Sequence, residues 1–386
     1  MEQSPALPRV LFVGVFPPAN RAVFGGMVTD CRALLGSSLP RRATLDLVDT
    51  TQASQPPPGF LRRLLLAVRR FFRYIGRVER GRPDAVLLFT AAGASVAEKG
   101  AMAWYARLRG IPALMFPRAG PVLDACQKSR FTRWWVRGAF AGARSVLCMG
   151  ETWQKFAQET LGFDAADTPI IASWTATHDL LALGAARRPA TGPVRLLFVG
   201  WVDREKGVGE LLEACRVLAR DRRFELTLVG EGNLSRDAKD FVAKHGLDAC
   251  IRFAGWRSGA DLHDAYARAD VFVLPSWSEG LPNAMVEAMA AGLACVVSSV
   301  GSVPDVVEDG ESALLVPPRD IAALERALAR VIDDSGLRAR LGAAGHAIAA
   351  RDFGVEQAVD HMLLAVKAAR ASPRRRSQQS GAAREA

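Results

Sequence analysis

The sequence predicts an α/β protein made of two doubly wound, Rossmann-like domains whose parallel sheets face each other across a cleft. Three observations lead to this fold class. Short apolar runs alternate with helical segments along the chain, which is typical of parallel sheets covered on both faces. The alternation restarts after residues 182–193, a stretch of small residues and prolines. The chain has 386 residues, more than one hydrophobic core usually supports.

The first series of elements predicts an N-terminal domain over residues 1–185. Runs of Val, Leu and Phe predict strands at 9–15, 43–48, 84–89, 111–116 and 143–149. Apolar residues that recur every three or four positions predict helices at 27–35, 60–82, 94–108, 131–140 and 152–161. The stretch 182–193 is the predicted hinge.

The second series predicts a C-terminal domain over residues 186–350. Strands are expected at 194–199, 225–229, 251–254, 271–274, 294–298 and 313–316. Helices are expected at 208–218, 237–245, 262–268, 283–291, 320–333 and 335–350. A helix over 351–371 is expected to cross back to the N-terminal domain. The polar, basic tail 372–386 is expected to be disordered.

Composition and motifs narrow the functional classes. The formal net charge of +10 favours acidic partners such as phosphates, anionic lipid or nucleic acid. The six cysteines form no CxxC pair, which indicates buried thiols in a reduced compartment. No signal peptide and no run of ~18 apolar residues is visible, so we expect a cytoplasmic protein. P-loop and GxGxxG motifs are absent, and so is any DxD, which fits chemistry without a metal or cofactor.

The stretch SEGLPNAMVEAMAAG, residues 278–292, places two carboxylates near a predicted helix start. Glu279 follows the strand 271–274, at the sheet edge where open α/β proteins bind ligands. Gly280 frees the backbone and Pro282 suits a first helical turn, whose N–H groups attract anions. Two interpretations stay open. In one, Glu279 is a helix-start acid and Glu287 a solvated side chain. In the other, both accept hydrogen bonds from a nucleotide-sugar whose phosphate lies at the helix start.

Residues 276–320 resemble the signature region of family 4 retaining glycosyltransferases, which have the GT-B fold. The resemblance rests on the E-x7-E pair, on Gly-Ser-Val-Pro-Asp-Val-Val and on Gly-x-x-Ala-Leu-Leu-Val. Residues 194–350 follow the family throughout, and the N-terminal half follows it more weakly. The resemblance implies a donor-binding C-terminal domain and an acceptor-binding N-terminal domain. It implies transfer of a hexose from a nucleotide-diphosphate sugar to a glycan or lipid-linked acceptor of the bacterial cell surface.

The resemblance also implies roles for individual residues. Glu279 would hold the donor sugar, and Lys206 would neutralise the leaving diphosphate. Arg118 stands where many members carry a histidine, and it is the third expected catalytic residue. Donor contacts are expected from Gly25, Gly26, Gly200, Arg204, Gly230, Gly232, Gly255, Gly280, Leu281, Pro282, Asn283 and Glu287. In this set Glu287 would bind the ribose, and the N–H groups of Gly280 and Leu281 would meet the diphosphate.

Two departures from the family pattern and one alternative function remain open. Trp201 replaces the arginine that many members carry after the glycine of the VG-R motif, and Ser173-Trp174-Thr175-Ala176 replaces the usual Asn-Gly-Val-Asp. The departures at Trp201 and Arg118 leave room for a non-catalytic GT-B protein that binds a nucleotide or glycan as a partner subunit.

The N-terminal half is strongly basic. In helix 60–82 apolar residues follow helical spacing and arginines lie on the other side; residues 128–137 add four cations and three aromatic rings. One interpretation is a packed helix with a solvated arginine face. The other is contact with anionic lipid on the inner face of the plasma membrane. The expected contact residues are Arg62, Arg69, Arg70, Arg73, Arg77, Arg133 and Arg137. A nucleic-acid partner is not expected, since no binding motif accompanies the charge.

Overall fold

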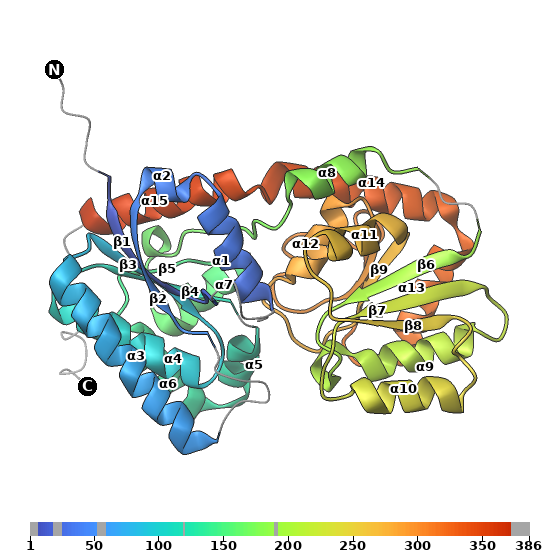
Figure 1. Cartoon of the computed structure of the whole chain (residues 1–386), viewed down its shortest axis with the longest axis horizontal. Coiled ribbons are helices and arrows are strands. Elements are labelled where there is room, and N and C mark those ends of the chain that lie inside the picture. The colour runs from blue at the N-terminus through green and yellow to red at the C-terminus, as the bar shows by residue number, and fades with distance from the viewer. Residues whose placement is uncertain (1–6, 18–24, 52–58, 119, 189–191, 372–386) are drawn as a thin grey trace, which may run out of the picture.

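The structure, a computed structural model, describes residues 7–17, 25–51, 59–118, 120–188 and 192–371. Two α/β domains lie side by side, each with a parallel sheet between layers of helices (Figure 1). The predicted fold class is confirmed. The predicted tail 372–386 and residues 189–191 of the predicted hinge lie outside the described residues.

The N-terminal sheet has the strand order β2-β1-β3-β4-β5, and every pairing is parallel. Its strands are β1 Arg9–Gly14, β2 Thr44–Asp49, β3 Ala85–Thr90, β4 Ala113–Pro117 and β5 Ser145–Val146. The helices of this part are α1 Gly26–Gly36, α2 Leu39–Arg42, α3 Phe60–Gly81, α4 Ala94–Leu108, α5 Pro121–Lys128, α6 Arg130–Phe140 and α7 Glu151–Phe156. The next helix, α8 His178–Ala185, packs on the C-terminal domain. In Figure 1, α3, α4 and α6 lie on one side of the sheet and α1 lies on the other.

The C-terminal sheet has the strand order β11-β10-β9-β6-β7-β8, again with parallel pairings. Its strands are β6 Val194–Val199, β7 Phe224–Val229, β8 Ile251–Gly255, β9 Val271–Leu274, β10 Ala294–Ser298 and β11 Leu314–Val316. Its helices are α9 Val208–Leu218, α10 Ser235–Lys244, α11 Ala260–Arg268, α12 Asn283–Ala290, α13 Ile321–Asp333 and α14 Ser335–Asp352. The strand β9 is fully buried, which explains its continuous apolar run.

The last described helix, α15 Val355–Ala371, lies against the N-terminal domain. It contacts α1 and β3, and it is tied to that domain by polar pairs. Asp360 accepts a hydrogen bond from Arg42 at 2.6 Å, and Arg370 pairs with Asp84 at 3.0 Å. The chain therefore reaches the C-terminal domain with α8, and its last described helix lies on the first domain, as Figure 1 shows.

Three local expectations differ from the structure. The predicted strand 143–149 shortens to Ser145–Val146, because Cys148 bridges to Ile170 instead of continuing along β4. The predicted hinge is wrong over 182–185, which form the last turn of α8, a helix packed on α12 and α14. Helix α5 was not predicted, although Gly120-Pro121 is a suitable helix start.

Strand order determines where a ligand can bind. In open parallel sheets, ligands bind beyond the carboxyl ends of the strands where the winding direction reverses. That point lies between β6 and β9 in the C-terminal sheet and between β1 and β3 in the N-terminal sheet. The loops 200–207 and 275–282 follow β6 and β9, so the two loops singled out in the sequence meet at this point.

Candidate functional site

Glu279 and Lys206 form an ion pair at the junction of these two loops. Lys206 Nζ donates to Glu279 Oε1 at 2.6 Å, and the buried Ser276 hydroxyl donates to the same oxygen at 2.7 Å. The Lys206 side chain remains 24% exposed and the Glu279 side chain 11% exposed, so a ligand can still reach them. The constellation therefore places a cation and a carboxylate, both within reach of solvent, beside the start of α12.

The loop that carries Lys206 is held rigidly against the loop that carries Glu279. Asp203 caps the short 3₁₀ turn by accepting from the Lys206 backbone N–H at 3.1 Å. Trp277 donates its backbone N–H to the Glu205 carbonyl at 2.8 Å. At Gly207, φ is 70°, and a Cβ there would overlap the Pro275 carbonyl, so only glycine allows this approach.

The start of α12 offers backbone donors next to the ion pair. Pro282 is the N-cap, so the helix begins at Asn283, as the sequence predicted. Within the described residues, no acceptor is recorded for the N–H groups of Gly280 and Leu281. These two groups and the positive end of the helix carry partial positive charge, which suits phosphate oxygens.

Glu287 lies one turn into α12 and is held by a tyrosine from α11. The buried Tyr266 hydroxyl donates to Glu287 Oε2 at 2.7 Å. Burial raises the pKa of Glu287 to about 7, opposed by the tyrosine hydrogen bond and reinforced by the nearby charge of Asp30. Burial and the Glu287 charge also raise the pKa of Tyr266. The carboxylate thus keeps Oε1 available for a hydroxyl donor such as a ribose.

Asn283 joins the two domains through both ends of its side-chain amide. Its Nδ2 donates to Asp30 Oδ1 at 2.7 Å and to the Gly26 carbonyl at 3.2 Å. Its Oδ1 accepts from Ser173 at 3.1 Å and lies 3.4 Å from Arg118 Nη2. Both ends of the amide are therefore occupied by hydrogen bonds to residues of the N-terminal domain. The donor contact expected for Asn283 would require these bonds to open, and it stays a prediction.

Arg118 lies in a buried ion pair of the N-terminal domain. Its Nε and Nη2 donate to Asp30 Oδ2 at 3.0 and 2.8 Å, and the side chains of Arg118 and Asp30 are only 4% and 2% exposed. Its guanidinium also lies over the rings of Trp174 and Phe116, 4.6 and 5.1 Å from their centroids. Burial raises the pKa of Asp30, opposed by the Arg118 charge and by the Asn283 and Arg118 hydrogen bonds. This geometry gives Arg118 a structural role, and its catalytic role stays a prediction.

The predicted donor-contact glycines differ in what lies beside them. Gly230 and Gly232 lie where a Cβ would overlap the carbonyls of Gly200 and Val202, so they permit the packing of the loops after β6 and β7. Gly25, at the start of α1, has open space beside it. Gly26 faces Asn283, Gly255 lies beside Glu231, and Gly200 lies beside Phe198. At Gly280 a Cβ would overlap the Met149 side chain.

Two residues of the loop after β6 are placed differently: Arg204, an expected donor contact, and Trp201, a departure from the family pattern. Arg204 is exposed and lies over the Trp277 ring at 5.3 Å, and Arg319 covers the same ring at 4.1 Å. Trp201 packs against Trp256, with ring centroids 5.1 Å apart. Trp201 therefore forms part of an aromatic pair at the ends of β6 and β8.

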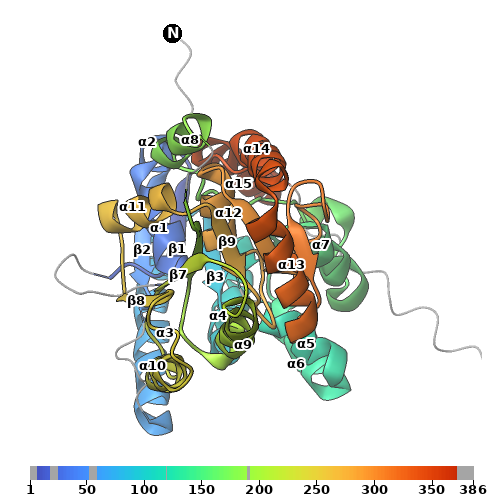
Figure 2. The ribbon, with the colours of Figure 1, turned by 90° about the vertical axis from the view of Figure 1, so that its right-hand side faces the viewer.

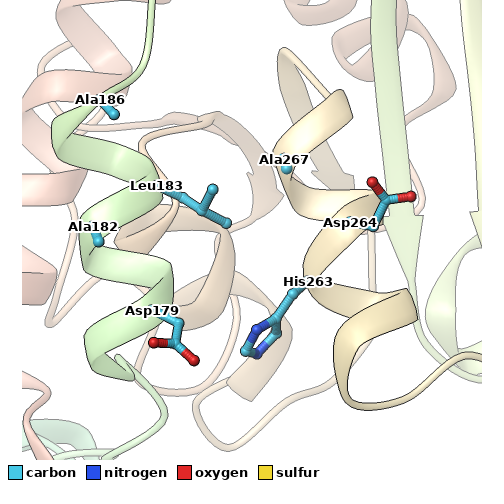
Figure 3. Close-up of a pocket in the computed structure, with 7 residues that line it drawn as sticks. All are labelled: Asp179, Ala182, Leu183, Ala186, His263, Asp264 and Ala267. Atoms are coloured by element: carbon cyan, nitrogen blue, oxygen red, sulfur yellow. The ribbon is translucent and has the colours of Figure 1, made fainter.

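A cavity of about 470 Å³ lies elsewhere, between α8 and α11 (Figure 3). Asp179 and His263 face each other across it, and the remaining wall is mostly apolar. None of the predicted site residues lines this cavity. In the ranges that the structure describes, no three His, Cys, Asp or Glu side chains gather as a metal-binding group.

The C-terminal domain matches a known family. Residues 193–334 match the family model Glycosyl transferases group 1. The chain is 35% identical over 196 residues to glycogen synthase of Mycobacterium tuberculosis, covering 50% of this chain and 47% of that protein. It is 32% identical over 197 residues to the lipopolysaccharide core biosynthesis glycosyltransferase LpsE of Rhizobium meliloti, covering 50% and 56%. The chain thus spans about half the length of the curated relatives it matches.

Solved structures with the same fold cover nearly the whole chain. Sucrose-phosphate synthase of Thermosynechococcus elongatus aligns with a TM-score of 0.74 and 20% identity, covering 93% of this chain and 98% of that chain. HepE of Anabaena, solved with UDP and glucose, aligns with a TM-score of 0.68 and 18% identity, covering 93% and 99%. The fold is therefore that of the GT-B glycosyltransferases. Residues 193–334 are thus similar to group 1 glycosyl transferases, and the matched relatives include a glycosyltransferase of lipopolysaccharide core biosynthesis, which confirms the predicted resemblance.

Several residues of the site could not be found from sequence. Tyr266, Ser276 and Asp30 each contact a predicted site residue; Ser276 lies at the start of the signature region 276–320, whereas Tyr266 and Asp30 lie outside it. Ser276, three residues before Glu279, carried a weak signal, because a hydroxyl beside a strand end suits a carboxylate. Asp30 and Tyr266 carried none, since their partners are far away along the chain.

Proposed function

We propose that this protein is a retaining glycosyltransferase. It transfers a hexose from a nucleotide-diphosphate sugar to a glycan or lipid-linked acceptor, in the synthesis of bacterial cell-surface polysaccharide at the inner face of the plasma membrane. The observation that carries the proposal is the Lys206–Glu279–Ser276 constellation, which lies at the start of α12 where the sheet reverses its winding. The relationship of the C-terminal domain to group 1 glycosyltransferases supports it.

The proposed mechanism assigns the leaving group to backbone donors and Lys206. As the bond between the sugar and the diphosphate breaks, negative charge grows on the phosphate oxygens. The N–H groups of Gly280 and Leu281 and the Lys206 ammonium stabilise that charge better in the transition state than in the ground state. Lys206 thereby supplies a fixed cation, so we expect transfer to continue in EDTA.

The two carboxylates hold the two ends of the donor. Glu279 accepts hydrogen bonds from sugar hydroxyls and fixes the reacting carbon relative to the acceptor. Glu287, oriented by Tyr266, accepts from the ribose. The acceptor attacks from the face that the diphosphate leaves, and a phosphate oxygen takes the acceptor proton. Closure of the domains, with Gly120 against Glu279, excludes water from the bond being transferred.

A thermal-shift screen with UDP-, GDP- and ADP-sugars identifies the donor, and turnover of that donor tests the proposal. Glu279→Gln should lower turnover far more than nucleotide affinity, whereas Glu287→Ala should weaken nucleotide affinity. Glu205→Gln is the matched control, because this exposed acid lies in the same loop as Lys206. Nucleotide binding without turnover of any donor would instead indicate a non-catalytic binding subunit.

A further inference from the structure

The large apolar side chains that reach solvent are concentrated on three neighbouring helices. In the described part of the chain, nine of the thirteen exposed large apolar side chains belong to α3, α4 and α6. They are Leu61, Leu64, Leu65, Val68, Phe72, Trp104, Leu108, Phe131 and Trp134. Helix α4 contacts both α3 and α6, and Figures 1 and 2 place the three helices on the same side of the N-terminal domain. Single exposed apolar residues are ordinary, but a cluster of this kind marks an interaction surface.

The length of α3 explains why its first half is uncovered. The helix has 22 residues, about 33 Å, whereas the neighbouring strand β2 has six residues, about 20 Å. Tyr74 and Val78, in the second half, are buried against the domain. The first turns extend past the sheet, where no strand is available to cover them.

The exposed side chains of α3 form one stripe. Leu61, Leu65 and Phe72 are 79%, 69% and 67% exposed, and with Val68 they follow one another at intervals of four, three and four residues. At 100° per residue, this spacing places them in a line. The packed residues Tyr74 and Val78 lie about 110–150° away from the stripe around the helix. Helix α3 therefore has two apolar faces, and only one of them is covered by the protein.

Cations flank this stripe, and no acids do. Arg62, Arg69 and Arg73 lie about 100° from the stripe, on the side away from the packed face, and all three are exposed. No Asp or Glu occurs between residues 60 and 78 or between 125 and 150, so α6 is also purely basic. Arg70 and Arg77, which the sequence assigned to this surface, are instead paired with Glu98 and Asp46, and they do not add to its free charge.

The ring pair of α6 extends the same chemistry. The ring centroids of Phe131 and Trp134 are 6.0 Å apart, and both side chains are exposed. Arg130 and Arg133, also exposed, are their neighbours in α6. Aromatic rings and long arginine side chains are the residues that anchor proteins in the boundary between headgroups and acyl chains. None of the helices described here has the length and hydropathy to cross a bilayer.

We propose that the first half of α3 and the start of α6 form a membrane-binding face that lies in the surface of an anionic bilayer. The α3 stripe and the α6 rings enter the acyl boundary, and Arg62, Arg69 and Arg73 contact the headgroup phosphates. Binding is driven by buried apolar area and by charge together. This face needs no glycosyl transfer to bind lipid. Combined with the proposed function, it would bring the N-terminal domain to an acceptor carried on a lipid.

Flotation of the full chain with vesicles tests this face. Wild type is expected to float with equimolar phosphatidylglycerol and phosphatidylcholine, and not with phosphatidylcholine alone. The variant L65S/F72S should bind the anionic vesicles more than about tenfold more weakly, because two apolar anchors are lost. Leu364→Ser on α15 is the matched control and should bind normally, since Leu364 is also exposed but lies outside the face.

The contribution of the arginine charges to vesicle binding is tested separately. Arg62→Gln, Arg69→Gln and Arg73→Gln should each weaken binding about fivefold, and less so in about 0.5 M salt. Arg236→Gln and Arg326→Gln, exposed on α10 and α13, should have no effect.

Three results would overturn the membrane face: no flotation of wild type, equal flotation of L65S/F72S, or a wild-type dimer that this variant dissociates. The last would show that a second copy of the chain covers the stripe. Nucleotide binding by every variant should match wild type, so a failure of this face is distinct from a failure of the proposed transfer reaction.

Discussion

The buried ion pair between Asp30 and Arg118 allows a quantitative test of the interdomain cluster. Asp30→Leu removes the carboxylate that accepts two hydrogen bonds from the guanidinium and one from Asn283. The remaining charge of Arg118 would stay 96% buried, with Nη1 already lacking a partner in the described structure. A buried charge left without its counter-ion costs about 3–5 kcal/mol.

The free energy of unfolding, measured with urea and circular dichroism, should therefore fall by about 3–5 kcal/mol in Asp30→Leu. Removing both charges in Asp30→Leu with Arg118→Met should recover most of this loss, because no unpaired charge remains. The surface pair Arg42–Asp360, whose side chains are 42% and 54% exposed, gives the control. Asp360→Ala should change the unfolding free energy by less than about 1 kcal/mol.

Two results would refute this reasoning. If Asp30→Leu costs no more than Asp360→Ala, the pair is not buried as described. If the double variant is as unstable as the sum of the two single variants, the charges do not act as a pair. In either case, Arg118 would be free for the catalytic role that its position in the sequence suggested.

Three further predictions concern the site. Because Glu287, with its pKa at about 7, accepts a hydrogen bond from the ribose more strongly when it is ionised, nucleoside diphosphate affinity should rise between pH 6 and pH 8, by up to about tenfold. Calorimetry should show proton release on binding below pH 7, and a flat profile for wild type, or an unchanged one in Glu287→Gln, would contradict the assignment. Tyr266→Phe removes a hydrogen bond that lowers this pKa, so the midpoint of the affinity profile should move to higher pH; an unmoved midpoint would show that the tyrosine does not orient the carboxylate. Gly120→Ala places a Cβ against the Glu279 carbonyl across the domain interface and should lower turnover about 100-fold, whereas Gly138→Ala, in open space on α6, should not; equal turnover of the two would mean that this contact is not part of the closed enzyme.

The loop and helix around the two glutamates were predictable because their signals are local. The run from Val271 to Leu274 forms β9 with the predicted bounds, and α12 begins at Asn283, where the helix was expected. A strand of apolar residues, a Gly-Pro turn and a small-residue helix each follow from neighbouring side chains alone. The family resemblance rests on the same short segment, so the donor side of the site was predicted more fully than the acceptor side.

Contacts between distant segments required the tertiary structure. Arg118 and Asp30 are 88 residues apart, and Glu287 and Tyr266 are 21 apart, so no spacing rule connects them. Their meeting depends on which loops the two sheets bring together and on how closely the domains approach at Gly120. Burial, which decides the pKa of Glu287, follows from the same packing.

Helix α3 shows where local and tertiary information divide. Its sequence determined that residues 60–81 form an amphipathic helix with arginines opposite its apolar residues. The sequence could not show that this helix is longer than the sheet beneath it. Only the packed structure decided that Tyr74 and Val78 are covered while Leu61, Leu65 and Phe72 remain exposed. Periodicity is a property of one segment, whereas burial depends on what lies against it.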